Sequence, residues 1–126
     1  DILTSGGILE NKKIGDMAQE YGVAMAIHMA ESPIACLAAV HSAAATENFL
    51  ALEFHSVDIP WWEQMVSGFP GPIVRDGFID VPDRPGLGIE ALNDEVLAEH
   101  LSPAHPGLWE STESWDRESS NDRLWS

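Results

Sequence analysis

The stretch that decides the fold is residues 23–54, VAMAIHMAESPIACLAAVHSAAATENFLALEF, in which two short apolar runs flank an alanine-rich segment. The first run, VAMAI at 23–27, is uniformly apolar, which is typical of a strand buried on both faces of a parallel sheet. The second run, NFLALEF at 48–54, predicts another buried strand, because a charge appears only at Glu53.

Helices are predicted on either side of the first strand. Ser32 as N-cap and Pro33 at the first helical position begin a helix over about residues 33–45. Residues 10–22 predict an amphipathic helix that ends at Gly22, a good residue for a left-handed cap. Its expected buried face consists of Ile14, Met17, Ala18 and Tyr21. Alternating helices and strands with short connections indicate an α/β fold with a parallel sheet.

The amino-acid composition changes after this α/β region, to which we assign residues 1–55. Prolines are frequent over residues 56–101, so we expect an irregular segment with a short strand near 78–81 and a short helix near 94–101. Residues 102–126 are polar and acidic without a clear period, and we expect a mobile tail or one that docks on another molecule.

Length and composition exclude several classes of protein. At 126 residues the chain has about half of the roughly 250 residues of a complete (β/α)₈ barrel. With 6 Lys and Arg against 21 Asp and Glu, the net charge of −15 disfavours nucleic acid as a partner. The longest apolar stretch, at 33–45, is too short for a membrane span, so we expect no membrane partner. A single cysteine favours a reducing, cytoplasmic location.

Three polar residues recur at intervals of about one βα unit. Asp1 precedes a Gly-Gly turn, His28 ends the first apolar run, and Glu53 lies near the end of the second. Because the carboxyl ends of parallel strands meet on one face of a barrel, these side chains are expected to converge. An imidazole between carboxyls suits proton transfer next to a carbonyl, in which a protonated carboxyl can also hydrogen-bond an oxyanion. The alternative is that His28 is a hydrogen-bonded strand-end residue and Glu53 is solvated.

Longer motifs give a specific resemblance. D-x-x-x-x-GG-I from Asp1, the strand ending in His28, SPIACLAAVHSAAATENFLALE at 32–53 and PGLGIE at 85–90 resemble the C-terminal half of the enolase superfamily, mandelate racemase subgroup. The resemblance extends to about Leu101. It implies the C-terminal part of a (β/α)₈ (TIM-like) barrel with its last three strands, followed by an irregular return segment toward a capping domain.

Within that subgroup, the segment ENFLALEFHS is most similar to acid-sugar dehydratases. The resemblance implies a magnesium-dependent β-elimination of water from a sugar acid. Asp1 and His28 would form a dyad, and Glu53 would hydrogen-bond the enediolate. Whether His28 is the acid or the base stays open. Racemase, epimerase or cycloisomerase chemistry is the alternative within the superfamily, and a non-catalytic acidic interaction module is the alternative outside it.

The same resemblance places essential parts outside this chain. The Mg²⁺ ligands and a further base are expected upstream of Asp1, so no metal ligand is assigned here and the isolated chain is expected to be inactive. The expected partners are a sugar acid and the remainder of the barrel with its capping domain, in a homo-oligomeric parent enzyme.

Several other residues are considered as parts of a site. His55 is expected on the same side as Glu53, either as a polar neighbour of the site or solvated. Trp61 and Trp62 either close over a substrate or pack against the barrel rim. Cys36 and His41 are not at the interval of helical zinc ligands, which disfavours a zinc site.

Overall fold

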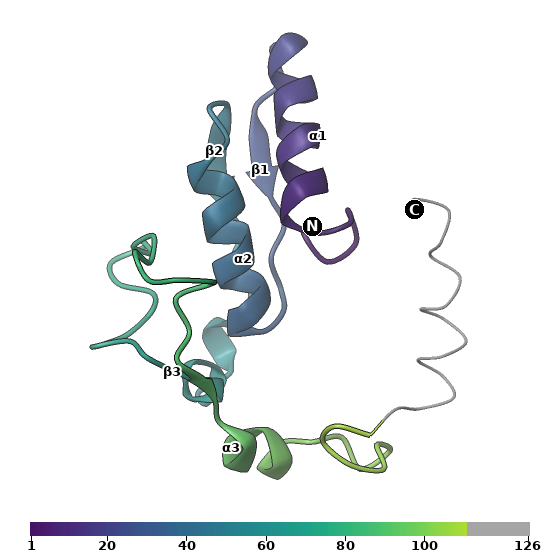
Figure 1. Cartoon of the computed structure of the whole chain (residues 1–126), viewed down its shortest axis with the longest axis vertical. Coiled ribbons are helices and arrows are strands. Elements are labelled where there is room, and N and C mark those ends of the chain that lie inside the picture. Colours follow the sequence, from purple (N-terminus) through teal and green to yellow (C-terminus); the bar gives the residue numbers. More distant parts are fainter. Residues whose placement is uncertain (111–126) are drawn as a thin grey trace. The chain divides into compact units, whose positions relative to one another are not determined.

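The computed structural model describes residues 1–110 of the chain and contains two compact units, of which the first covers Asp1–Leu92 and the second begins at Asn93. The first unit starts with an alternation of helices and strands (Figure 1): α1 at Ile8–Glu20, β1 at Met25–Ile27, α2 at Pro33–Ala44 and β2 at Phe49–Leu52. Two 3₁₀ turns and two very short strands follow: η1 at Ser56–Asp58, η2 at Trp62–Met65, β3 at Val66–Ser67 and β4 at Ala91–Leu92.

The strands β1 and β2 are parallel and are joined through α2, so the predicted βαβ unit is confirmed. Ile27 pairs with Leu52 and Ala26 with Ala51, and the register shifts between Ala26 and Met25. The helices α1 and α2 lie side by side, and α2 packs against β2 (Figure 1). Both strands are shorter than the apolar runs that predicted them.

The predicted helix boundaries are correct to within about two residues. The side chain of Ser32 accepts a hydrogen bond from the backbone N–H of Ala35 at 3.5 Å, and Pro33 follows it at the first helical position. Gly22 lies just beyond α1 with a φ of 68°, the left-handed conformation that favours glycine. Local sequence therefore determines where these helices begin and end.

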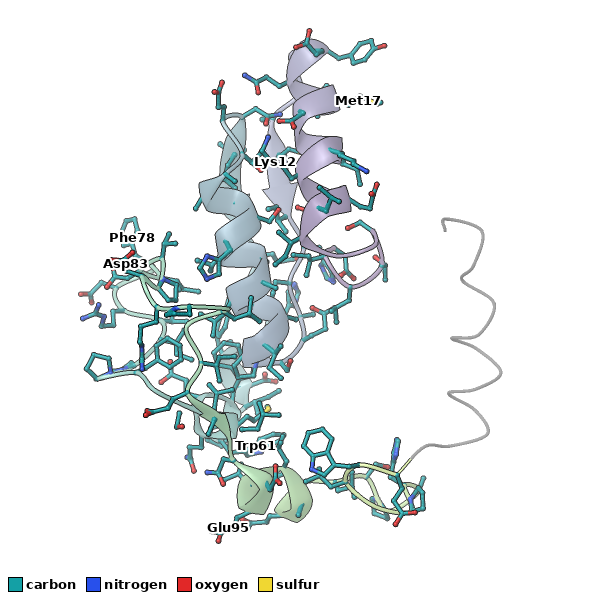
Figure 2. All side chains as sticks on the ribbon, in the orientation of Figure 1. Lys12, Met17, Trp61, Phe78, Asp83 and Glu95 are labelled. Carbon is teal, nitrogen blue, oxygen red and sulfur yellow. The ribbon has the colours of Figure 1, made fainter. Side chains whose placement is uncertain are left out.

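The predicted buried face of α1 is wrong. Ile14, Met17 and Tyr21 are exposed, and the side chain of Met17 extends away from the helix (Figure 2). The buried residues of α1 are instead Asn11 and Gly15. Periodicity identifies an apolar face, but it does not identify which face the neighbouring helix covers.

The contact between α1 and α2 is small and polar. The hydroxyl of Ser42 in α2 donates a hydrogen bond to Oδ1 of Asn11 at 2.9 Å, and both residues are buried. A Cβ on Gly15 would lie 2.8 Å from Cγ2 of Thr46, so the helices approach too closely for any side chain there. Thr46 in turn donates its hydroxyl hydrogen bond to the Ser42 carbonyl at 2.7 Å.

The apolar core lies around α2 and the segment after β2. Its main cluster consists of Met29, Cys36, Leu37, Trp62, Val66 and Ile73. A second cluster contains Ile2, Ile27, Ala39 and Ala43. Burial raises the pKa of the Cys36 thiol to about 12, which keeps it protonated at neutral pH.

The expectation that both strands are fully buried is wrong for the chain as it stands. In β2, Phe49, Leu50 and Ala51 are exposed, and Ala26 in β1 is exposed as well. The sheet that contains β1 and β2 has only these two strands in the described part of the chain, which leaves much of it exposed.

The region after β2 is irregular, as its prolines predict, but its one predicted strand is wrong. Near 78–81 there is a single bridge between Arg75 and Phe78, and Arg75 pairs with Asp80 across the turn. The observed antiparallel pair is β3 with β4, in which Val66 lies opposite Leu92. Strands of two residues have no periodicity that sequence could reveal.

The second unit contains α3 at Asp94–Glu99, which confirms the helix predicted near 94–101. The side chain of Asn93 caps it by accepting a hydrogen bond from the Val96 N–H at 3.4 Å. Most of the tail predicted to be mobile, residues 111–126, lies outside the described residues. Within residues 1–110, no helix has both the length and the apolar content needed to cross a lipid bilayer.

We expect Gly15→Ala to destabilise the chain by about 1–3 kcal/mol, because the added methyl group meets Thr46 at the helix contact. At an ordinary helical position the same change stabilises a protein, so the sign of the effect is diagnostic. Urea unfolding measures it. The double variant Gly15→Ala, Thr46→Ser removes the opposing methyl group but keeps the hydroxyl, and it should recover most of the loss. Stabilisation by Gly15→Ala alone would contradict the close packing.

Candidate active site

Two of the expected site residues meet at the carboxyl end of the parallel strand pair. His28 follows Ile27, the last residue of β1, and Glu53 follows Leu52, the last residue of β2. Ile27 and Leu52 are partners in the register, and the N–H of Glu53 donates to the Ile27 carbonyl at 2.9 Å. The backbone pairing itself therefore places the two side chains next to each other.

A single carboxylate joins two imidazoles at this place. Nδ1 of His28 is hydrogen-bonded to Oε2 of Glu53. Nε2 of His55 is hydrogen-bonded to Oε1 of Glu53 at 2.6 Å. The two rings are tilted by 55° with their centroids 6.0 Å apart. Of the two readings of His55, the structure supports that of a polar neighbour of Glu53.

Asp1 lies close to His28, as its position in the sequence predicts. Asp1, His28 and Glu31 each present a ligand-type atom, and these atoms lie within 4.8 Å of one another. The hydrogen bond of the Asp1 carboxylate is local, since Oδ1 accepts from the N–H of Leu3 at 2.8 Å. Sequence reasoning missed Glu31, whose only signal is its position in the loop that follows His28.

The hydrogen bonds determine the charge of Glu53. His55, and then His28, lower the pKa of the Glu53 carboxyl below its usual value, because both imidazoles stabilise the carboxylate. A carboxyl that donates a hydrogen bond to an oxyanion needs the opposite shift. In this structure Glu53 is therefore an acceptor that holds the two rings.

The loop that carries His28 is anchored from the segment after β2. The carbonyl of Glu31 accepts a hydrogen bond from Nε1 of Trp62 at 2.7 Å and another from the hydroxyl of Ser56 at 3.3 Å. Trp62 is buried and meets the ring of Phe54 edge-on, with centroids 5.0 Å apart. Of the two roles considered for Trp62, the structure supports packing.

The donor atoms of the described residues do not fit Mg²⁺. Residues 1–110 contain two groups of three potential ligands, one with His28, Glu53 and His55 and one with Asp1, His28 and Glu31. Each group includes at least one imidazole, whereas Mg²⁺ prefers oxygen ligands in octahedral geometry. We therefore assign no magnesium ligand to this part of the chain.

Taken together, a βαβ unit with polar side chains converging at its strand ends defines an α/β protein with a parallel sheet. Residues 1–96 match the enolase C-terminal domain-like family, and the chain belongs to that family. Its α/β fold is thus the C-terminal part of a (β/α)₈ barrel, as the motifs predicted.

Curated relatives and a solved structure resemble the chain over most of its length. It is 39% identical to a D-xylonate dehydratase of Haloferax volcanii over 78% of this chain and 23% of that protein. It is 36% identical to a D-gluconate/D-galactonate dehydratase of Picrophilus torridus over 80% of this chain and 25% of the relative. A mandelate racemase/muconate lactonizing enzyme-like protein from Rubrobacter xylanophilus superposes with a TM-score of 0.76 at 39% identity, covering 82% of this chain and 26% of the other. The chain therefore spans about a quarter of the length of these proteins.

We expect His55→Asn to raise the pKa of Glu53 toward its ordinary value, because the largest stabilising contact of the carboxylate is lost. Carbon-detected NMR titration of the Glu53 carboxyl measures the change. In the unaltered chain, the stabilisation that these hydrogen bonds supply is present above the ordinary carboxyl pKa and is lost as the pH falls through the lowered value. His105→Asn alters an exposed histidine in the second unit and should leave Glu53 unchanged. An unshifted Glu53 in His55→Asn would show that the contact does not form in solution.

Proposed function

We propose that the chain is the C-terminal portion of an acid-sugar dehydratase, a hydro-lyase that removes water from a sugar acid to give a 2-keto-3-deoxy acid. The proposal rests mainly on the positions of Asp1 and Glu53, which both lie close to the imidazole of His28 at the end of β1. The similarity to curated dehydratases supports the same reaction class.

In the proposed reaction, the α-proton leaves C2 of the sugar acid and the C3 hydroxyl departs as water, which gives an enol that rearranges to the keto acid. Nδ1 of His28 is held by Glu53, so proton transfer falls to Nε2 of the same ring. His28 either protonates the departing hydroxyl or removes a proton on its own face. General acid–base catalysis of this kind contributes about 10²–10⁴-fold to the rate.

The surrounding carboxylates would position the ring. Glu53 fixes the tautomer of His28 by accepting from Nδ1–H, and the Asp1 carboxylate lies near the same ring.

Several parts of this proposal lie in the remainder of the enzyme. Mg²⁺, when bound, would hold the substrate carboxylate and stabilise the enediolate, with ligands contributed by residues upstream of Asp1. The barrel and capping domain would enclose the substrate, so the isolated chain would be inactive. We place the parent enzyme in the cytoplasm, in keeping with the buried, unpaired Cys36, and we expect it to be a homo-oligomer.

A racemase, epimerase or cycloisomerase of the same superfamily is the second candidate. It is favoured by the similarity to the mandelate racemase/muconate lactonizing enzyme-like structure. The two candidates differ in the fate of the C3 hydroxyl, which is lost only in dehydration.

The first test is the coding sequence upstream of Asp1. The proposal requires three carboxylates at strand ends, spaced one βα unit apart, to hold the metal. If the upstream sequence lacks them, the dehydratase proposal is wrong.

The second test is enzymatic. In the complete enzyme we expect His28→Asn to lower kcat for D-xylonate, D-gluconate or D-galactonate by about 10²–10⁴-fold, because proton transfer is lost. Formation of 2-keto-3-deoxy products with added Mg²⁺ measures it, and His105→Asn is the matched control. Full activity in His28→Asn would refute the assigned role, and exchange of the α-proton without elimination would favour racemisation or epimerisation.

A further inference from the structure

The site offers a second kind of chemistry that lies beyond the proposed function. We propose that His28, Glu53 and His55 form a binding site for a borderline divalent transition-metal ion of the Zn²⁺ class. The three side chains supply two imidazole nitrogens and one carboxylate, a ligand combination known from zinc sites that keep one position open for water.

The arrangement is already close to what a metal requires. The three ligand-type atoms lie within 4.8 Å of one another, and both imidazoles turn a ring nitrogen toward the same carboxylate. Ligands about 2 Å from a tetrahedral ion lie about 3.3 Å apart, so small side-chain rotations suffice. The side chains have exposed fractions of 47% for His28, 43% for Glu53 and 57% for His55, so an ion can reach them in this chain.

The donor set selects among metals. Imidazole nitrogen suits Zn²⁺, Ni²⁺ and Cu²⁺, whereas Mg²⁺ prefers oxygen ligands and gives up its water reluctantly. The net charge of −15 raises the local concentration of cations of either kind, so selectivity rests on the nitrogen ligands rather than on charge.

The neighbouring group of Asp1, His28 and Glu31 is the weaker competitor. It supplies only one imidazole, and its carboxylates already accept backbone hydrogen bonds, Asp1 from Leu3 at 2.8 Å and Glu31 from Ala30 at 3.0 Å. The proposed site has a second imidazole, that of His55, whose Nε2 already contacts Glu53. The pair His28 and His55 therefore determines where the ion binds.

Metal binding would compete with proton transfer, since both use the ring of His28. This consequence rests on the proposed function, but the binding itself does not. An ion bound to Nδ1 replaces the hydrogen bond of that nitrogen to Glu53, and the neutral ring then carries its proton on Nε2, so Nε2 could no longer accept a proton.

Calorimetric titration of the full, chelator-treated chain with Zn²⁺ alone tests the site. We expect one equivalent to bind, with shifts of the His28 and His55 ring resonances in NMR spectra. His28→Asn and His55→Asn should each weaken binding by at least about tenfold. His105→Asn should bind as the unaltered chain does, and Mg²⁺ at the same concentration should give no such shifts.

Two outcomes would overturn the inference. One is that the unaltered chain takes up no Zn²⁺. The other is that Zn²⁺ binds without moving the His28 and His55 resonances, which would locate it elsewhere even if a variant failed to fold. Neither outcome bears on the dehydratase proposal, because that is tested by turnover of a sugar acid.

Discussion

The parallel register of β1 and β2 is the constraint on which the site depends. Ile27 lies opposite Leu52, and the N–H of Glu53 donates to the Ile27 carbonyl, so the next side chains in line are His28 and Glu53. A slip of one residue would turn Glu53 to the opposite face of the sheet. Two residues that are distant in sequence become hydrogen-bonding partners because a βαβ unit brings strand ends together on one edge.

The register alone leaves the loops beyond the strands undetermined, and a second set of contacts fixes them. Trp62 and Ser56 both donate hydrogen bonds to the carbonyl of Glu31. They tie the loop that follows β1 to the segment that follows β2. Met29, which follows His28, and Trp62 both belong to the main apolar cluster, so the loop is connected to the core directly and through the buried indole.

Sequence predicted those features that depend on local chemistry or on strand spacing. The Ser32-Pro33 helix start, the Gly22 cap and the convergence of His28 with Glu53 belong to this class. Prediction from sequence failed where the packing of an element depends on which neighbouring element it contacts. The α1–α2 contact uses Asn11 and Gly15 rather than the apolar stripe, since close approach and a buried hydrogen bond to Ser42 decide it. The charge of Glu53 was not predicted for the same reason, because it depends on whether His55 turns a ring nitrogen toward the carboxylate.

The negative charge of Glu53 limits what this residue can do in a reaction. A protonated carboxyl can donate to an enediolate oxygen, but a carboxyl held by two imidazoles accepts hydrogen bonds and its pKa is lowered. The two roles exclude each other as long as His28 and His55 both face it. For Glu53 to donate from Oε1, His55 must turn away from that oxygen, while Oε2 can still accept from His28. As long as both rings face it, Glu53 orients His28, and in the proposed reaction that ring would transfer the proton.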